Sequence, residues 1–496
     1  MSTEERLPPN YAKLDVALRS IGYSFEAAVA DIIDNSIDAG AKDIFVRLVL
    51  KKDQPLDIVI WDNGSGMDSE TLKEAMRFGA DVSHELQRLG KFGLGLKLAS
   101  LSQAKEVRVF SQYSGRLSGR GWLEEGIKSG FVCNIFTLHE CQSALKRLVP
   151  DCEWDGSGTV VWWSHLYRVG QNHADPEEYA QKLLNRLYNS LSLAFHRFIA
   201  GKPRKIRIVM DIFDADSGQA GVERRVDALN PFGYDQSGHK GFPLELLVGD
   251  GYDGRIKLAA HIWPANSEEP EYKLPGGANS RQGFYFYRNN RLIQGGGWNG
   301  IREAEPHLSL ARVEVDIAPD FDVEVSLDVK KVEVQLPSPL VKAIQTAKAK
   351  SGVDFKKYLS LADEIYRTRT TVEAELPIIP SKGIPSELRE FLIAELSIKG
   401  NTKYRNLDFQ WATLDEDVFF DIDLGSDAVY LNQLYRRQLL HGLPGSASDI
   451  PVVKCLLFLL LRDAFSADRV GSRLREFLEL ANRILVKAAD FERTVK

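Results

Sequence analysis

Residues 31–41, with the sequence DIIDNSIDAGA, constrain the fold more than any other stretch of the chain. On a helix, Asp31, Asn35 and Asp38 occupy positions i, i+4 and i+7 and therefore share one face. The apolar residues between Phe25 and Ile37 lie towards the other face, which packs. Carboxylates on one face repel each other by roughly 0.2–0.5 kcal/mol per pair unless a cation, a donor or water compensates. The stretch predicts a helix whose polar face either is solvated or faces a ligand.

The composition is typical of globular proteins, with 44% hydrophobic and 27% charged residues in a chain of 496. A chain of this length is expected to divide into roughly three domains. The net charge of −6 argues against a protein that coats nucleic acid, although it is compatible with a local basic patch. The four cysteines form no CxxC pair, which disfavours a zinc site or a disulfide framework.

The sequence predicts a cytoplasmic protein that does not associate with membranes. Its first residues, MSTEERLPPNYAKL, lack the apolar core of a signal peptide. The longest apolar run, from Cys455 to Leu461, is much shorter than the roughly 18 residues that cross a bilayer.

Two alternating segments, residues 42–50 and 56–61, predict strands, and the second runs directly into the sequence DNGSGM. Asp62 ends this strand, and Gly64 and Gly66 let the backbone turn sharply before Met67. The carboxylate is then left at the edge of the sheet, where it can accept a hydrogen bond from the amino group of a planar ligand. The alternative is a plain Asp-Gly turn.

A capped helix over residues 69–79 is followed by the glycine-rich sequence GKFGLG at residues 90–95. Because this loop opens onto an apolar helix over residues 94–101, its N–H groups can converge on a phosphate. The chain contains no GxxxxGK[ST] sequence, which excludes a P-loop. The loop also follows a helix and a polar segment rather than a strand, which argues against a dinucleotide-binding fold.

A fourth motif, Gly156 to Trp163, is a glycine turn that enters a strand. The order of the four motifs resembles that of the GHKL ATPases, a superfamily that includes DNA gyrase B, histidine kinases, the heat-shock chaperone ATPases, MutL and MORC. This resemblance covers all four nucleotide-binding motifs within residues 26–163. It implies that the chain binds ATP and Mg²⁺.

The resemblance also implies roles for individual residues. Asn35 matches the family's magnesium ligand, since a hard cation prefers oxygen ligands. Asp62 matches the aspartate that binds adenine, with Gly66 and Thr159 near the base. The remaining predicted cofactor-binding residues are Asp38, Gly64, Met67 and, in the ATP lid, Gly90, Lys91, Phe92, Gly93, Leu94 and Gly95.

The chain departs from the family at the general base. MutL, MORC and the chaperones carry a glutamate four residues before the asparagine, and this chain has Asp31 there. Aspartate supports the same proton transfer, but it is one methylene shorter, and a displacement of about 1 Å can cost on the order of 10²-fold in rate. Asp34 is the alternative base, disfavoured because it points about 100° around the helix from Asn35.

A helix over residues 176–200 ends at the sequence GKP, which predicts a domain boundary. Nearby basic residues are candidates for DNA contact, although such runs are usually solvated: Arg197, Lys202, Arg204, Lys205 and Arg207. Alternating strands then dominate to about residue 336. Residues 283–293 predict a strand, a tight turn and a returning strand, with half of the aromatic side chains in the core. This stretch resembles the RNNRLI strand of MORC, which lies in a second α/β domain called the transducer.

Residues 325–334 resemble the MutL segment that ends the transducer and places a lysine on the γ-phosphate of ATP. The resemblance implies that Lys331 is this switch lysine, with Lys330 as the alternative. An ammonium group there favours the charge of the terminal phosphate. Pro319-Asp320 and Asp328 to Lys330 also spell a PD…DxK pattern, but a nuclease site is disfavoured because the gap is short.

Residues 377–385 predict a linker, and the residues beyond it are expected to be mainly helical. Residues 456–461 are apolar all round, so a helix there is buried in a core or against a partner. The predicted organisation is α/β. A GHKL domain at residues 1–200, a sandwich of a mixed sheet with helices on one face, precedes an α/β transducer at 201–340, a helix and linker at 341–385 and a helical module at 386–496.

From the resemblance, which extends to the MORC-like bacterial ATPases of restriction and phage-defence systems, we expect a clamp that closes as a homodimer on ATP binding. Its expected partners are DNA and, through the helical module, a nuclease or other effector. The alternatives are an adaptor or chaperone-like module that binds a protein client, and a nucleotide switch with slow turnover. A histidine kinase is disfavoured because that architecture has no transducer.

Overall fold

The computed structural model divides the chain into two compact units. Unit 1 is built from described residues within 1–230, 287–293 and 318–334, and unit 2 from those within 231–286, 294–317 and 335–496. Because the segments of the two units interleave along the chain, the predicted domain boundaries stay predictions. The residues that the structure describes are 10, 13, 16, 23–51, 57–78, 89, 95–130, 132–150, 154–167, 176–249, 251–252, 256–265, 267–318, 326–327, 334–374, 378–396, 404–441, 443–465 and 472–494.

Helix α2 (Phe25–Asp38) is the predicted helix of the first motif. The Ser24 hydroxyl oxygen accepts a hydrogen bond from the amide of Ala27 at 3.1 Å, which caps the N-terminus. Gly40, with φ of +80°, follows the C-terminus in the left-handed conformation that glycine favours. Asp31 and Asp34 are buried along with the apolar residues. The polar face of this helix is therefore buried at Asp31, half-buried at Asn35 and exposed at Asp38.

Unit 1 contains one mixed sheet in the order β5-β4-β3-β6-β2-β1-β7-β8, with β9 also paired to β7. β1 and β7 run parallel, whereas β1 and β2 and then β2 and β6 run antiparallel. The strands are β1 (Asp43–Leu50), β2 (Asp57–Asp62), β3 (Ala104–Tyr113), β4 (Arg116–Trp122), β5 (Asn134–Phe136), β6 (Gly158–Leu166), β7 (Arg207–Asp214), β8 (Gln219–Ala220) and β9 (Arg224–Arg225).

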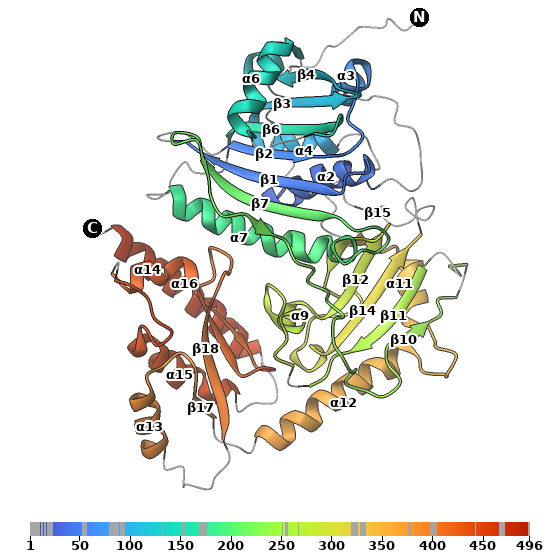
Figure 1. The fold of residues 1–496 in the computed structure, drawn as a ribbon. Coiled ribbons are helices and arrows are strands. Elements are labelled where there is room, and N and C mark those ends of the chain that lie inside the picture. The colour runs from blue at the N-terminus through green and yellow to red at the C-terminus, as the bar shows by residue number, and fades with distance from the viewer. Residues whose placement is uncertain are drawn as a thin grey trace, which may run out of the picture. The chain divides into compact units, whose positions relative to one another are not determined.

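Helices cover both faces of this sheet (Figure 1). Ile44, Val46 and Leu48 of β1 pack against α2, α4 and α7 in the larger core, whereas Val49 packs with α6 on the opposite face. This differs from the expectation of helices on one face only, because Cys141 and Leu148 give α6 an apolar side of its own. The further helices are α3 (Ser69–Met76), α4 (Gly95–Gln103), α5 (Glu124–Lys128), α6 (Leu138–Leu148), α7 (Pro176–Ala194) and α8 (His196–Ile199).

A second sheet has the order β10-β11-β14-β12-β13. Asn289 and Asn290, with φ of +47° and +67°, form the predicted tight turn between β12 and β13. The prediction that half of the aromatic residues in β12 are core was wrong, since all six of its residues are buried. The elements are β10 (Leu244–Leu246), β11 (Ile256–Ile262), α9 (Pro270–Lys273), α10 (Gly277–Ser280), β12 (Gly283–Arg288), β13 (Arg291–Gly295), η1 (Pro306–Leu308), β14 (Ala311–Ile317), α11 (Ser338–Gln345) and α12 (Phe355–Ala374), with the separate pair β15 (Ser326–Leu327) and β16 (Val334–Gln335).

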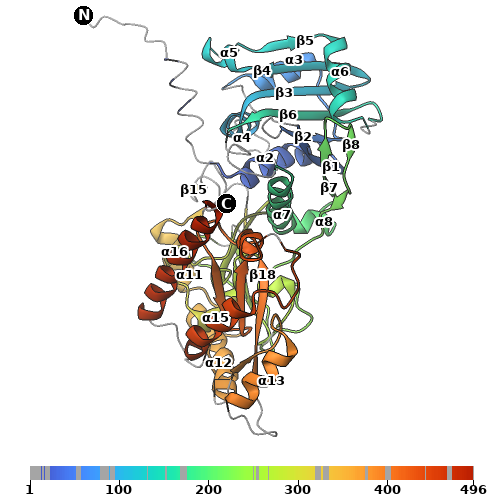
Figure 2. The same cartoon turned by 90° about the vertical axis from the view of Figure 1, so that its left-hand side faces the viewer.

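The C-terminal part of unit 2 is an α/β module rather than a helical one (Figure 2). Its helices pack against a sheet of four strands in the order β17-β18-β20-β19, and β17 lies within the predicted linker. No helix in the described part of the chain is both long and apolar enough to cross a membrane. The elements are β17 (Ile378–Pro380), α13 (Ser386–Glu395), β18 (Arg405–Ala412), β19 (Phe420–Asp423), β20 (Ala428–Asn432), η3 (Gln433–Tyr435), α14 (Arg436–Leu439), α15 (Pro451–Phe465) and α16 (Ser472–Thr494).

Candidate functional site

Asp31 lies at the buried end of the polar face of α2 and is 3% exposed. The Tyr23 hydroxyl donates a hydrogen bond to Asp31 Oδ2 at 3.1 Å. The carbonyl of Tyr23 accepts a hydrogen bond from Gln103 Nε2 at 3.2 Å, so the last residue of α4 anchors this tyrosine. The first residue of α4, Gly95, is also close, since a Cβ built on it would lie 3.6 Å from Asp31 Oδ2. The positive end of the α4 dipole therefore stabilises the Asp31 carboxylate.

Asn35 and Asp38 lie on the next two turns of the same face of α2. Asn35 Nδ2 is buried, and it has no hydrogen-bond partner in the described part of the chain. Asp38 Oδ1 accepts a hydrogen bond from the amide of Leu89 at 3.0 Å. This bond ties Leu89, which directly precedes the glycine-rich sequence, to α2.

Asp34, the alternative base, is engaged elsewhere in unit 1. Its Oδ1 lies 3.2 Å from Arg291 Nε in an ion pair whose two side chains are 1% and 7% exposed. The Arg291 guanidinium also lies 4.6 Å from the centre of the Phe195 ring. A carboxylate held by a buried arginine is poorly suited to accept a proton, because the ion pair favours its charged form. This pairing supports the preference for Asp31, which stays a prediction.

Asp62 ends β2 with a buried side chain. The Ser36 hydroxyl of α2 donates to Asp62 Oδ2 at 2.7 Å, and the amide of Gly64 donates to Oδ1 at 2.8 Å. Burial raises the pKa of the Asp62 carboxyl, and hydrogen bonds from Gly64, Ser36 and Thr159 oppose that effect. The two predicted elements, α2 and the Asp62 turn, are thus joined directly through Ser36.

The glycine turn after Asp62 is fastened to the next strands. Gly66 has φ of +67°, and a Cβ on it would lie 1.8 Å from the carbonyl oxygen of Gln112, so only glycine fits. The amide of Met67 donates to Ser111 Oγ at 2.8 Å, and Ser111 Oγ lies 2.9 Å from Thr159 Oγ1. The structure therefore brings Met67 and Thr159 together through Ser111, and their predicted role in binding adenine stays a prediction.

Several predicted site residues lie outside the described residues. They are Gly90, Lys91, Phe92, Gly93 and Leu94 of the glycine-rich loop, and Lys331 with its alternative, Lys330. The residues of the PD…DxK pattern, Pro319, Asp320, Asp328, Val329 and Lys330, lie there as well.

Sequence reasoning missed four residues that shape this site: Tyr23, Ser36, Ser111 and Arg291. Ser36 and Asp62 are 26 positions apart, and no local pattern connects them. The sequence contained a partial indication that Arg291 matters, because this residue lies in the segment that resembles the MORC RNNRLI strand.

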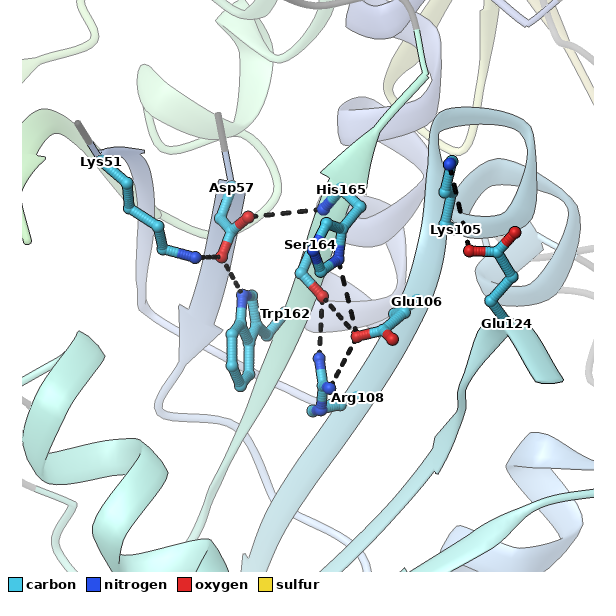
Figure 3. A network of polar contacts seen from close by, with 9 residues as sticks. All are labelled: Lys51, Asp57, Lys105, Glu106, Arg108, Glu124, Trp162, Ser164 and His165. Carbon is cyan, nitrogen blue, oxygen red and sulfur yellow. Dashed lines mark hydrogen bonds and ion pairs between the residues drawn. The ribbon is translucent and has the colours of Figure 1, made fainter. Parts of the chain in front are cut away.

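The opposite end of β2 carries a second polar cluster (Figure 3). Asp57 begins the strand and is 2% exposed. It forms an ion pair with Lys51 and accepts hydrogen bonds from Trp162 Nε1 at 3.0 Å and from the amide of His165 at 3.4 Å. The rest of the cluster consists of Lys105, Glu106, Arg108, Glu124 and Ser164. Its polar groups bind each other.

Residues 23–159 match the family of histidine kinase-, DNA gyrase B- and HSP90-like ATPases. This range holds the polar face of α2, the Asp62 turn, the start of α4 and Thr159. The chain therefore carries an ATPase domain of this family, with the mixed α/β fold that the sequence predicted.

Among curated proteins, the chain is similar to several MICRORCHIDIA proteins of Arabidopsis thaliana. MICRORCHIDIA 7 is 31% identical over 207 residues, which are 40% of this chain and 28% of that protein. MICRORCHIDIA 6 is 31% identical over 91 residues, 18% of this chain and 14% of that protein. MICRORCHIDIA 4 is 32% identical over 94 residues, 18% and 12% of the two chains. The matches thus span less than a third of each of these relatives.

Proposed function

We propose that the protein binds Mg·ATP at this site, hydrolyses it to ADP and phosphate, and uses the cycle to close and reopen a dimeric clamp. One observation carries the proposal. A single buried helix, α2, presents Asp31 and Asn35 one turn apart and is joined through Ser36 to the buried carboxylate of Asp62. The two adjoining elements thereby hold three groups: Asp31 as the base, Asn35 as the cation ligand and Asp62 as the acceptor for an amino group.

The described residues fit a nucleotide. The side-chain nitrogen of Asn35 is buried and has no hydrogen-bond partner in the described part of the chain. A flip of the side-chain amide would present its oxygen to Mg²⁺ instead. The Asp62 carboxylate can accept a hydrogen bond from the amino group of adenine. When bound, Mg·ATP supplies the phosphoryl group that is transferred to water and the cation that neutralises its charge.

Asp31 would accept the proton of the attacking water. Tyr23 and the start of α4 hold its carboxylate in place, so Asp31 enters the reaction already oriented. Its shorter side chain favours slow turnover, which makes a slow nucleotide switch the second candidate function.

The clamp mechanism depends on residues whose roles are implied by the family resemblance. Gly90 to Gly95 would close over the phosphates, Lys331 would sense the γ-phosphate, and two subunits would associate when the lid closes. The buried pair of Asp34 and Arg291 connects α2 to the β12–β13 turn within unit 1, so a shift of this turn would act on the helix that carries the base.

Steady-state hydrolysis of Mg·ATP, measured over a range of protein concentrations, tests the proposal. We expect turnover to rise more than linearly with concentration. In Asp31→Asn it should fall by about 10²- to 10⁴-fold, because a general base is lost, while ATP still binds. The control is Glu26→Gln, which changes a carboxylate of the same helix that pairs with Arg186 outside the site.

Linear turnover with concentration would contradict the dimer, and equal turnover in Asp31→Asn and the wild type would contradict the role of Asp31. ATP binding without turnover in the wild type would favour the nucleotide switch.

The substrate of the clamp is proposed to be DNA in a bacterial defence or restriction system, with a nuclease or other effector as partner, and this part rests on resemblance alone. Two of the five basic residues are engaged within unit 1, since Arg197 stacks on Tyr287 and Arg207 pairs with Asp43. DNA affinity that falls steeply between 50 and 200 mM salt would support contact with phosphates. Salt-insensitive binding of a protein client would favour the adaptor instead.

A further inference from the structure

The turn between β12 and β13 is anchored among residues of unit 1. Residues 287–293, which form this turn and the strand ends beside it, belong to that unit. The Tyr287 hydroxyl lies 2.8 Å from His196 Nε2, and the Arg197 guanidinium lies 3.6 Å from the centre of the Tyr287 ring. Arg197 Nη1 also donates a hydrogen bond to Asn290 Oδ1 at 3.4 Å. The start of α8 therefore holds the turn in place.

Two arginines of this turn are buried, and each binds a residue close to the nucleotide motifs. Arg291 forms the ion pair with Asp34 of α2. Arg288, which is 6% exposed, donates a hydrogen bond from Nη1 to the carbonyl oxygen of Leu89 at 3.2 Å. Because a buried guanidinium needs acceptors for its donors, this bond restrains Leu89 as well as Arg288.

Leu89 is held at three points. Its carbonyl accepts the hydrogen bond from Arg288, its amide donates to Asp38 Oδ1 at 3.0 Å, and its side chain is 4% exposed in the larger core of unit 1. The partners in the two hydrogen bonds lie 199 and 51 positions away in the sequence. The position of Leu89 is therefore set by tertiary contacts and not by its neighbours along the chain.

This position matters because Leu89 directly precedes Gly90, the first residue of the predicted phosphate-binding sequence. Glycine-rich segments lose more conformational entropy than others when they become ordered around a ligand. A fixed starting point lowers that cost, because fewer conformations are available to the segment before binding. Holding Leu89 in place should therefore raise the affinity for phosphates.

We propose that Arg288 is a positioning residue for nucleotide binding, which acts by holding the carbonyl of Leu89 and does not itself touch the nucleotide. The inference rests on the proposed binding of Mg·ATP and deepens it, since it assigns part of the affinity to a side chain of β12. Because the effect passes through the residue before Gly90, it concerns the phosphates of the nucleotide and not the base.

The first test is the affinity for ATP in Arg288→Met, which keeps an unbranched side chain and loses every donor. Isothermal titration with Mg·ATP should show a Kd raised by about fivefold to thirtyfold. Arg288→Lys keeps one charged donor group, so its Kd should lie between those of Arg288→Met and the wild type. Adenosine, which has no phosphates, should bind equally to all three proteins.

The matched control is Arg108→Met, which removes a partly buried arginine from the polar cluster at the other end of β2 (Figure 3). Arg108 binds Ser164 and Glu106 there, so its loss should lower the melting temperature and leave the affinities for ATP and adenosine unchanged.

The second test is hydrogen exchange at the Leu89 amide in the absence of nucleotide. If Arg288 holds this residue, exchange should accelerate by at least about fivefold in Arg288→Met, because the bond from the amide to Asp38 then opens more often. Arg288→Lys serves for both measurements if Arg288→Met does not fold.

Unchanged affinity for ATP in Arg288→Met would overturn the proposal. A folded variant in which the Leu89 amide exchanges faster while ATP binds as in the wild type would do the same. Equal losses of affinity for ATP and adenosine would also overturn it, because a general disturbance of the site would then explain the effect. A wild type that binds no ATP would contradict this proposal and the proposed function together, whereas ATP binding without turnover would contradict only the hydrolysis.

Discussion

Strand β2 has a buried aspartate at each end, and the two ends are built in opposite ways. Asp57 is neutralised by Lys51 and receives hydrogen bonds from Trp162 and His165 (Figure 3). Asp62 pairs with no cationic side chain in the described part of the chain and is held by a serine and a glycine turn. A carboxylate satisfied by its own protein stabilises the fold, whereas one kept buried without a counter-charge has capacity left for a ligand.

The largest expected difference between the two ends is in nucleotide affinity. Asp62→Asn should weaken ATP binding by about 10- to 100-fold, because hydrogen bonds to a charged group contribute about 1.5–3 kcal/mol. Asp57→Asn should leave the affinity unchanged. Isothermal titration with ATP measures both variants, and an equal loss of affinity in the two would abolish the distinction between the ends.

Stability should show the reverse order. Asp57→Asn removes the partner of Lys51 and should lower the free energy of unfolding by about 1–2 kcal/mol, a value reduced because Lys51 is partly exposed. Asp62→Asn should cost less, since it leaves no cation unpaired in the described part of the chain. Urea denaturation at neutral pH compares the two, and a larger loss for Asp62→Asn would contradict the comparison.

The pH dependence sharpens the same contrast. Burial raises the pKa of Asp62 in the folded state above its ordinary value of 3.8, so the folded protein holds this proton more tightly than the unfolded chain. Stability from this group is therefore complete below pH 3.8 and is lost as the pH rises through the raised pKa. Relative to the wild type, Asp62→Asn should gain stability between acidic and neutral pH. Urea midpoints measured across that range should diverge in this direction, and parallel curves would show that the shift is absent.

The sequence predicted the parts of the site that lie close together in the chain. Asp31, Asn35 and Asp38 follow from helical spacing, and Asp62 with its glycines follows from a strand that ends in a turn. The contacts of Ser36 with Asp62 and of Asp34 with Arg291 join residues 26 and 257 positions apart, so no local pattern could indicate them.

The fold was predicted less evenly. Long alternating strands and capped helices were evident in unit 1, whereas in the C-terminal module the strands β19 and β20 are short and carry polar residues. Phe420 to Asp423 do alternate apolar and polar residues, but the alternation lasts only four residues, the shortest run that indicates a strand. The prediction of a helical module rested on its two longest helices and overlooked the alternation of Leu407, Phe409 and Trp411 with polar residues in β18.

The smallest expected effect concerns Tyr23, which distinguishes the Asp31 site from a merely buried carboxylate. Tyr23→Phe removes the hydroxyl that donates to Asp31 Oδ2 but keeps the aromatic ring in the core. Because the phenol holds the carboxylate that we propose as the base, kcat should fall by about threefold to tenfold while the Kd for ATP stays the same. The matched control is Tyr188→Phe, which removes a similar hydrogen bond to Asp227 far from the site in sequence and should leave kcat unchanged. A tyrosine that only stabilised the fold would lower the melting temperature and leave kcat intact, so that outcome would remove Tyr23 from the mechanism and leave Asp31 positioned by α2 and the start of α4.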